Sequence, residues 1–200
     1  MDILQHRLIP TDASELVSYR ADLDSSGALE HPSVAVIHFA VTTSAEATEQ
    51  VLRAREYVSC HVCIDSNRVI QMVPFDKVAF HAGPSLYKGR TRVNSFSLGI
   101  EMANPGPLVK QADGSFKTTY GAKWEGEVFE GKHKNGACPY RFWAAFENDA
   151  LERCAQVVDL WRENYGITAV VGHDDVSPGR KIDPGPAFPM VWLRDVTGLL

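Results

Sequence analysis

The residues best suited to chemistry lie in one short segment of the sequence, 172–185. It holds His173, Lys181 and Asp183 in a stretch interrupted by proline and glycine. The apolar run 167–171 before it predicts a short strand, so His173 would leave a strand end while the following turn returns Lys181 and Asp183 to the same place. Rigid turns that present imidazole and carboxylate groups to one point favour a metal site over a core. One segment can supply only part of a ligand set, so the rest must come from elsewhere.

His38 is the candidate for the missing ligand. It lies in the run 34–41, which is nearly all apolar and predicts a strand covered on both faces. The ordinary alternative is a core histidine bonded to a backbone carbonyl, because buried ring nitrogens need partners. Together with His173 and Asp183, however, His38 gives two imidazoles and a carboxylate, a combination used by catalytic zinc with an open position for water. Nitrogen and oxygen ligands also suit other divalent metals.

Hydrolysis at such a site needs a group that moves a proton and a group that stabilises charge. Glu101 is the only acidic residue of the predicted strand 97–102, and burial among its apolar neighbours would raise its pKa towards a useful range. A strand-end glutamate in solvent is the alternative. Lys181 lies two residues before Asp183, so both point the same way in an extended segment, and Lys181 could stabilise an oxyanion. Its alternative is a surface lysine.

The elements that must position these side chains form an α/β pattern. Predicted strands alternate with a few helices, which indicates a central mixed β-sheet flanked by α-helices in a single domain. Residues 1–33 are polar and irregular and predict an N-terminal arm before a domain at 34–200. The stretch 105–140 has no clear period and predicts a long loop excursion beside the site, with little regular structure beyond a hairpin. Strands are predicted at 34–41, 60–65, 68–74, 97–102 and 167–171, and helices at 44–58, at 147–165 and after Pro186.

The composition excludes several classes of protein. The chain has 200 residues, 44% of them hydrophobic and 22% charged, as in an ordinary soluble globular protein. No apolar run approaches the roughly 18 residues of a membrane span, and no secretory signal is visible, so we expect a cytoplasmic protein. The net charge of −5 without a basic stripe argues against nucleic acid and against capture on an anionic membrane or cell wall. We therefore expect recognition in a cleft.

The four cysteines are expected to be reduced and mostly buried. Cys60 and Cys63 have the spacing of a metal or redox motif. In the predicted strand, however, positions three apart point to opposite faces, and no second pair completes a structural zinc site. The sequence favours structural thiols over ligands.

Several segments together resemble a known family, the zinc-dependent N-acetylmuramoyl-L-alanine amidases (amidase type 2). The resemblance covers about residues 34–192, keeps the motifs in order, and is closest to the cytoplasmic anhydromuropeptide amidases of peptidoglycan recycling. The motifs that carry it are Val36-Ile37-His38, Ser59-Cys60-His61, Val73-Pro74-Phe75-Asp76-Lys77, His81-Ala82-Gly83, Tyr87-Lys88-Gly89-Arg90-Thr91-Arg92-Val93-Asn94, Ser97-Leu98-Gly99-Ile100-Glu101, Gly172-His173-Asp174 and Arg180-Lys181-Ile182-Asp183-Pro184-Gly185-Pro186.

The resemblance implies Zn²⁺ as the cofactor, held by His38, His173 and Asp183. It implies that Glu101 acts first as general base and then as general acid, and that Lys181 is an electrostatic stabiliser. The expected reaction is hydrolysis of the amide bond between N-acetylmuramic acid, including 1,6-anhydro forms, and L-alanine of peptidoglycan or muropeptides.

The resemblance also implies contacts with the substrate. Arg92 and Asn94 match positions that bind muropeptide, and His81 lies in the loop that lines the cleft. The stretch 105–140 is longer than in the compact recycling enzymes, so the size of the substrate does not carry over. The oligomeric state is not implied.

Three other functions compete with this interpretation. A peptidoglycan-binding module on the same fold would lack catalysis, but such relatives typically have a metal ligand replaced, and here the whole set is present. A phage-type lysin or toxin would act on intact wall, and the absence of positive charge favours recycling instead. An uncharacterised metallopeptidase is the third alternative.

Overall fold

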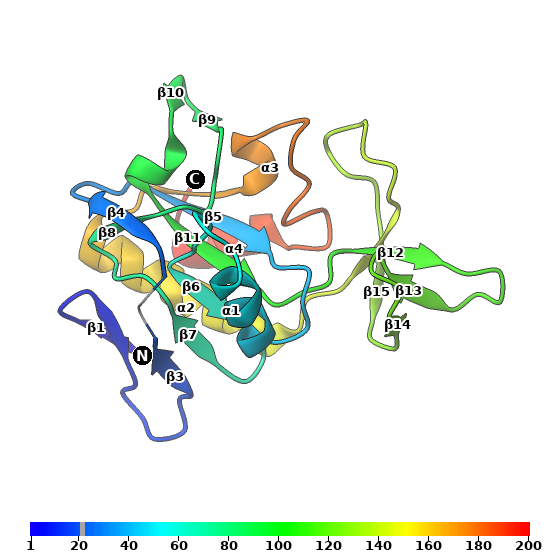
Figure 1. Ribbon diagram of the computed structural model, residues 1–200, viewed down its shortest axis with the longest axis horizontal. Coiled ribbons are helices and arrows are strands. Elements are labelled where there is room, and N and C mark those ends of the chain that lie inside the picture. Colours follow the sequence, from blue (N-terminus) through cyan, green and yellow to red (C-terminus); the bar gives the residue numbers. More distant parts are fainter. Residues whose placement is uncertain (21–22) are drawn as a thin grey trace.

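A six-stranded mixed sheet forms the centre of the computed structural model, which describes residues 1–20 and 23–200 (Figure 1). Its strand order is β17-β5-β11-β6-β7-β3. All neighbouring pairs are parallel except β6 and β7, which are antiparallel. The strands are β3 (Val17–Tyr19), β5 (Val34–Phe39), β6 (Val62–Ile64), β7 (Val69–Gln71), β11 (Ser97–Met102) and β17 (Ala169–Gly172).

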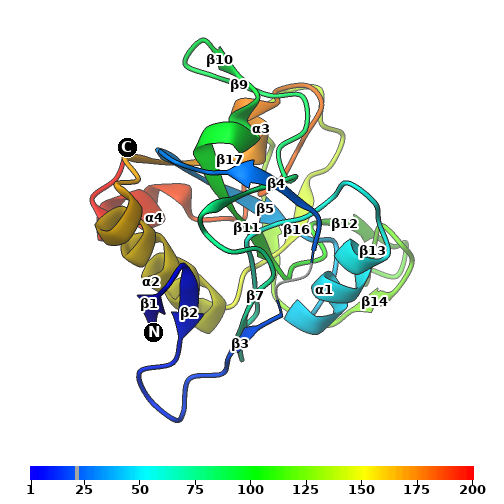
Figure 2. The same cartoon turned by 60° about the vertical axis from the view of Figure 1, so that its left-hand side comes forward.

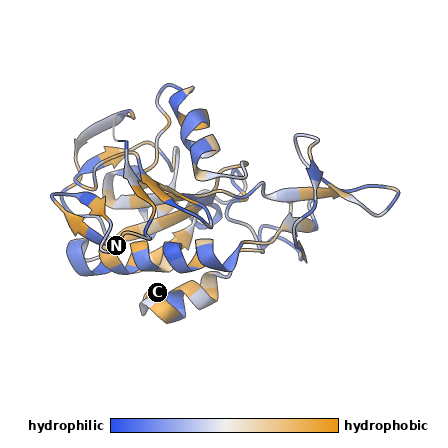
Figure 3. Cartoon of the chain, turned by 90° about the horizontal axis from the view of Figure 1, so that it is seen from below, coloured by the Kyte–Doolittle hydropathy of each residue, from blue (hydrophilic) through white to orange (hydrophobic). Residues whose placement is uncertain are grey.

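Helices cover both faces of this sheet, as the sequence predicts. Figure 2 shows α2 (Asn148–Tyr165) and α4 (Met190–Thr197) on one side of the central strands and α1 (Ala45–Arg53) on the other. The long helix α2 is amphipathic. Figure 3 shows both apolar and hydrophilic residues along it, and its apolar side chains join the main core. The turn of α3 (His173–Val176) and the 3-10 helix η1 (Val93–Phe96) cover the remaining part of the second face.

Local sequence explains where the helices begin and end. Ser44 precedes α1 and its hydroxyl accepts a hydrogen bond from the backbone N–H of Ala47 at 3.1 Å. Gly166 follows α2 in the left-handed conformation at φ 70°, where glycine carries no steric cost. The predicted helix 44–58 is shorter in the structure because α1 ends at Arg53.

The N-terminal residues are more regular than the irregular arm expected at 1–33. A hairpin joins β1 (Asp2–Leu4) to β2 (Arg7–Ile9), and β3 becomes an edge strand of the central sheet by pairing with β7. Further along, β4 (Ser25–Ala28) pairs with β8 (Lys77–Ala79). The partners of β3 and β4 lie tens of residues away, so no local periodicity reveals those two strands. Residues 21–22 of this arm lie outside the described residues.

The excursion expected at 105–140 is also more regular than predicted. Residues 105–144, which we call the extension, form an antiparallel sheet in the order β14-β13-β12-β16-β15 that projects from the main body (Figure 1). Its strands are too short to show an alternating pattern, which explains why the sequence indicated a loop. They are β12 (Pro107–Lys110), β13 (Phe116–Thr118), β14 (Lys123–Trp124), β15 (Val128–Glu130) and β16 (Phe142–Ala144).

The remaining elements are small. The hairpin of β9 (Leu86–Tyr87) and β10 (Arg90–Thr91) projects above α3 (Figure 1). None of the helices formed by residues 1–20 and 23–200 combines the length and the hydropathy needed to cross a bilayer.

Candidate metal centre

Three parallel strands bring the predicted chemical residues to one edge of the sheet. His38 lies on β5, directly opposite Glu101 of β11 in the pairing register. On the other side of β5, Gly172 ends β17, and His173 follows it. Because the carboxyl ends of parallel strands meet at the same edge, residues 135 positions apart become neighbours.

Asp183 is returned to this edge by the turn that follows α3. The backbone N–H of Asp174 donates to the carbonyl of Asp183 at 2.8 Å, which joins the two ends of the turn. Residues 173–183, which we call the metal loop, therefore deliver His173 and Asp183 together. The prediction that this segment folds back on itself agrees with the structure.

Three ligand atoms converge in a small triangle. The Nδ1 atoms of His38 and His173 lie 2.8 Å apart, and each lies 2.9 Å from Oδ2 of Asp183. All three side chains are buried. Close to each other and shielded from water, they form a candidate metal centre.

The hydrogen-bond partners of His38 assign its protons. Ser97 donates its hydroxyl to the carbonyl of Val93 at 2.8 Å, so its oxygen accepts from Nε2 of His81 at 3.2 Å. His81 then has a lone pair on Nδ1, which accepts from Nε2 of His38 at 3.1 Å. This relay leaves Nδ1 of His38 without a proton and directed at the triangle.

His173 is assigned in the same way. Its Nε2 lies 3.0 Å from the carbonyl of Ala82, which can only accept, so Nε2 carries the proton. Nη2 of Arg180 donates to the same carbonyl at 2.6 Å. It lies 3.3 Å from Nε2 of His173 because both groups donate to that oxygen. The lone pair on Nδ1 of His173 therefore also faces the triangle.

These assignments fit a divalent cation. Two imidazole lone pairs and a carboxylate oxygen that face one another repel unless a positive charge lies between them. Nitrogen and oxygen donors in this number are those of catalytic zinc sites. The carbonyl and imidazole partners behind the two histidines are the supports that metal-binding imidazoles usually have.

The acidity of the ligands agrees with this geometry. Burial, reinforced by the neighbouring His173, lowers the pKa of His38 to about 4, so its imidazole is neutral at pH 7. A neutral imidazole is the state that binds metal.

Glu101 presents a carboxyl group with a free oxygen. Its Oε2 is buried and has no hydrogen-bond partner among the described residues. Burial, followed by the negative charge of Asp183, raises the pKa of Glu101 to about 8, against the opposing effect of Lys181 and Arg55. A carboxyl group in a cleft whose pKa lies near neutral pH suits proton transfer.

Lys181 completes the cleft. It lines a cavity of about 320 Å³ together with His38, Glu101, His173 and Asp183. Apolar side chains from the end of β5, from α1 and from the segments that follow each of them also line the cavity. These are Phe39, Val41, Val51, Leu52 and Val58. The structure thus brings together all five residues predicted to bind metal or act in catalysis.

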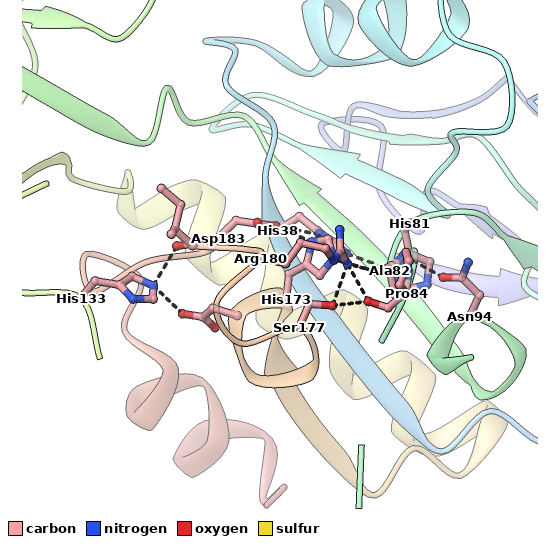
Figure 4. Close-up of polar contacts among 12 residues, drawn as sticks. His38, His81, Ala82, Pro84, Asn94, His133, His173, Ser177, Arg180 and Asp183 are labelled. Atoms are coloured by element: carbon pink, nitrogen blue, oxygen red, sulfur yellow. Dashed lines mark hydrogen bonds and ion pairs between the residues drawn. The ribbon is translucent and has the colours of Figure 1, made fainter. Parts of the chain in front are cut away.

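Of the three residues predicted to bind substrate, His81 lines this same cavity, whereas Arg92 and Asn94 lie elsewhere. His81 is buried, and both its ring nitrogens are engaged by His38 and Ser97. Arg92 and Asn94 line a separate pocket of about 390 Å³. Asn94 accepts a hydrogen bond from the backbone N–H of Ala82 at 2.7 Å, and in Figure 4 it lies beyond Ala82 as seen from His173. Their contact with substrate stays a prediction.

The structure adds contacts that the sequence did not indicate. Arg180 donates to the carbonyls of Ala82 and Pro84 and to the hydroxyl of Ser177, and so ties the metal loop to the loop at 82–84. Its place in a turn gave no sign of this role. His133 of the extension also reaches the metal loop (Figure 4), although nothing in its Gly- and Lys-rich surroundings marks it.

The cysteines are free, and none belongs to the metal centre. Burial raises the pKa of the Cys60, Cys63 and Cys154 thiols, which disfavours the thiolate needed for metal binding. The prediction of structural rather than ligating thiols agrees with these surroundings.

The fold and the ligand geometry define a hydrolase-like metal centre, and the sequence comparison gives its family. Residues 28–186 match the family described as N-acetylmuramoyl-L-alanine amidase, and the chain belongs to this family. The 1,6-anhydro-N-acetylmuramyl-L-alanine amidase AmpD of Enterobacter cloacae is 36% identical over 126 residues, which are 63% of this chain and 48% of that protein. AmpD of Escherichia coli strain K12 is 32% identical over 140 residues, covering 68% of this chain and 56% of that protein. The chain thus spans about half the length of these relatives.

A solved structure supports the same assignment. The complex of the N-acetylmuramyl-L-alanine amidase AmiD from E. coli with the substrate anhydro-N-acetylmuramic acid-L-Ala-D-gamma-Glu-L-Lys superposes with a TM-score of 0.64 at 28% identity. The match covers 84% of this chain and 58% of that chain. The predicted family and the predicted α/β fold, a mixed sheet flanked by helices, are confirmed.

Proposed function

We propose that this protein is a zinc-dependent N-acetylmuramoyl-L-alanine amidase that cleaves the amide between N-acetylmuramic acid and L-alanine. The observation that carries the proposal is the convergence of His38, His173 and Asp183 beside the free carboxyl oxygen of Glu101 in one cleft. Membership of the amidase family supports amide hydrolysis as the reaction of this site.

His38, His173 and Asp183 would hold the zinc ion. When bound there, zinc polarises a carbonyl group and lowers the pKa of water. In its ionised form, Glu101 takes the proton of the attacking water through its free carboxyl oxygen and then passes it to the departing amine of L-alanine. The positive charge of Lys181 stabilises the negative charge that develops on the carbonyl oxygen. The apolar wall of the cleft limits competing water around Glu101.

The names of the relatives support a muropeptide substrate. AmpD is named for 1,6-anhydro-N-acetylmuramyl-L-alanine, and AmiD was solved with an anhydro-muropeptide as its substrate. We infer that the protein acts on muropeptides, including 1,6-anhydro forms, and that it serves peptidoglycan recycling in the cytoplasm. The net charge of −5 supports this choice over capture on the anionic cell wall.

Purified protein should be incubated with anhydromuropeptides and with intact sacculi, and the released peptide measured for each. The proposal expects rapid release from anhydromuropeptides and one equivalent of zinc by metal analysis. Glu101→Gln should keep its zinc and lose turnover by several orders of magnitude. Binding of muropeptide without any release would support a non-catalytic module, and faster release from sacculi would support a lysin.

A further inference from the structure

Residues 133–135 of the extension contact the metal loop, and among them His133 places a buried imidazole against it. Nδ1 of His133 accepts a hydrogen bond from the backbone N–H of Asn135 at 2.9 Å, so the proton of the neutral ring lies on Nε2. Nε2 stands 2.9 Å from Oδ2 of Asp174 and 3.1 Å from the carbonyl of Ile182. A single N–H group thus faces two acceptors of the metal loop.

The two acceptors lie next to the two ligands of the loop. Asp174 follows His173, and Ile182 precedes Asp183. Because the backbone N–H of Asp174 also donates to the carbonyl of Asp183, His133 closes a small network around both ends of the loop. Any movement of this imidazole would shift both ends.

Charge on the extension supports the same contact. The side chain of Asp174 is buried, and its Oδ1 lies 2.9 Å from Nζ of Lys134. The same ammonium group lies 2.6 Å from Oδ1 of Asp175. Lys134 therefore neutralises a carboxylate that would otherwise be buried beside the ligands without a counter-charge.

The body of the extension holds His133 in place. The buried indole of Trp143 lies beside the imidazole with ring centroids 5.8 Å apart, and its Nε1 donates to the carbonyl of Gly131 at 3.0 Å. Trp143 also lies against Gly185, two residues past the metal loop, where an added Cβ would lie only 2.9 Å from its ring. His133 is thus held by contacts within the extension.

We propose that the extension positions the metal loop, with His133 as the positioning residue that fixes His173 and Asp183 for metal binding. His133 does not touch the metal or the substrate; it acts through Asp174 and Ile182. The inference rests on the candidate metal centre and not on the amidase reaction, so the two can fail separately.

The test measures zinc affinity by competition with a chromophoric chelator, which requires no turnover. His133→Leu removes the donor and should weaken zinc affinity about tenfold, as loss of a supporting partner of a ligand does. His133→Gln places an amide N–H near the position of Nε2 and should recover most of the affinity. A melting curve of each metal-free variant checks that the fold is intact.

Thr118→Val is the matched control. It removes a buried hydroxyl of the same sheet, which accepts from the N–H of Ala122 at 3.0 Å without touching the metal loop. Its zinc affinity should equal that of the wild type. Wild-type affinity in His133→Leu, or equal losses in His133→Leu and Thr118→Val, would overturn the proposal. If the wild type itself binds no zinc, this inference and the proposed function both fail, whereas zinc binding without amidase activity would contradict the proposed function alone.

Discussion

Glu101 carries a carboxyl group of the cleft whose pKa is raised, and this has a consequence for stability. Burial raises its pKa from 4.5 to about 8 in the folded protein. The folded state therefore keeps a proton that the unfolded chain loses near pH 4.5. The stabilisation is complete below that pH and is lost as the pH rises towards 8.

We expect this effect in the metal-free protein at about 1.4 kcal/mol for each pH unit of the window. Between pH 4.5 and 8, the free energy of unfolding of the wild type should fall relative to that of Glu101→Gln, whose amide does not titrate. Urea denaturation at a series of pH values, with chelator present, measures the difference. A constant difference across the window would show that Glu101 is already ionised in the folded protein.

His81 offers a second test at the level of single residues. Nδ1 of His81 accepts a hydrogen bond from Nε2 of His38, and this bond leaves Nδ1 of His38 without a proton. His81→Phe removes that acceptor. We expect zinc affinity to fall about tenfold. His81→Asn, whose side-chain oxygen lies near the position of Nδ1, should retain more affinity. If His81 instead binds substrate, as the sequence resemblance implies, His81→Phe would raise KM and leave zinc affinity unchanged.

The five residues of the centre could be predicted because their chemistry is unusual for their surroundings. His38 and Glu101 interrupt buried strands, and the segment after β17 combines histidine, lysine and aspartate with turn residues. The relay through His81 and the contact from His133 could not be predicted, because each depends on a pairing between distant segments. The separate pocket of Arg92 and Asn94 likewise follows from how the loop at 82–84 folds.

Among the elements, β11 is packed closely against neighbouring side chains at Gly99, in the middle of the strand. A Cβ on Gly99 would lie 2.7 Å from two ring atoms of His81 and 2.9 Å from Sγ of Cys60. These neighbours are buried and have little room to move. Glycine is therefore required here because the imidazole of His81 lies against the strand.

Gly99→Ala should destabilise the protein by about 1–3 kcal/mol, as overpacking of a core does, and should displace His81 from His38. Thermal unfolding measures the first effect, and zinc titration the second. Gly136→Ala is the control, because a Cβ there meets nothing within 4 Å. Equal melting temperatures for the two variants would contradict the close packing around β11.

The length of an element decided how well the sequence predicted it. The strand predicted at 97–102 is β11, and the helix predicted at 147–165 is α2 within one residue. Both segments show a clear hydrophobic periodicity and a clear end in the sequence. The strands of the extension have two to four residues each, too few for a period, and are stabilised by pairing with one another. Such strands cannot be predicted from the local sequence, because only pairing in the folded sheet stabilises them.

For the whole molecule, metal binding should contribute to stability. An ion that binds only the folded state raises the free energy of unfolding in proportion to the logarithm of its free concentration over Kd. Chelation should therefore lower the melting temperature of the wild type by several degrees, and added zinc should restore it. His173→Ala should melt at the same temperature with and without chelator. A wild type insensitive to chelator would argue against the centre.

The separation of the ligands along the chain has a consequence for biosynthesis. His38 and Asp183 are 145 positions apart, and β5, which carries His38, lies between β11 and β17 in the sheet. A nascent chain on the ribosome exposes His38 early but cannot assemble the triangle until the metal loop has emerged. Zinc capture must therefore follow translation of nearly the whole described chain, so cellular zinc supply would act on a folded apoprotein rather than on its synthesis.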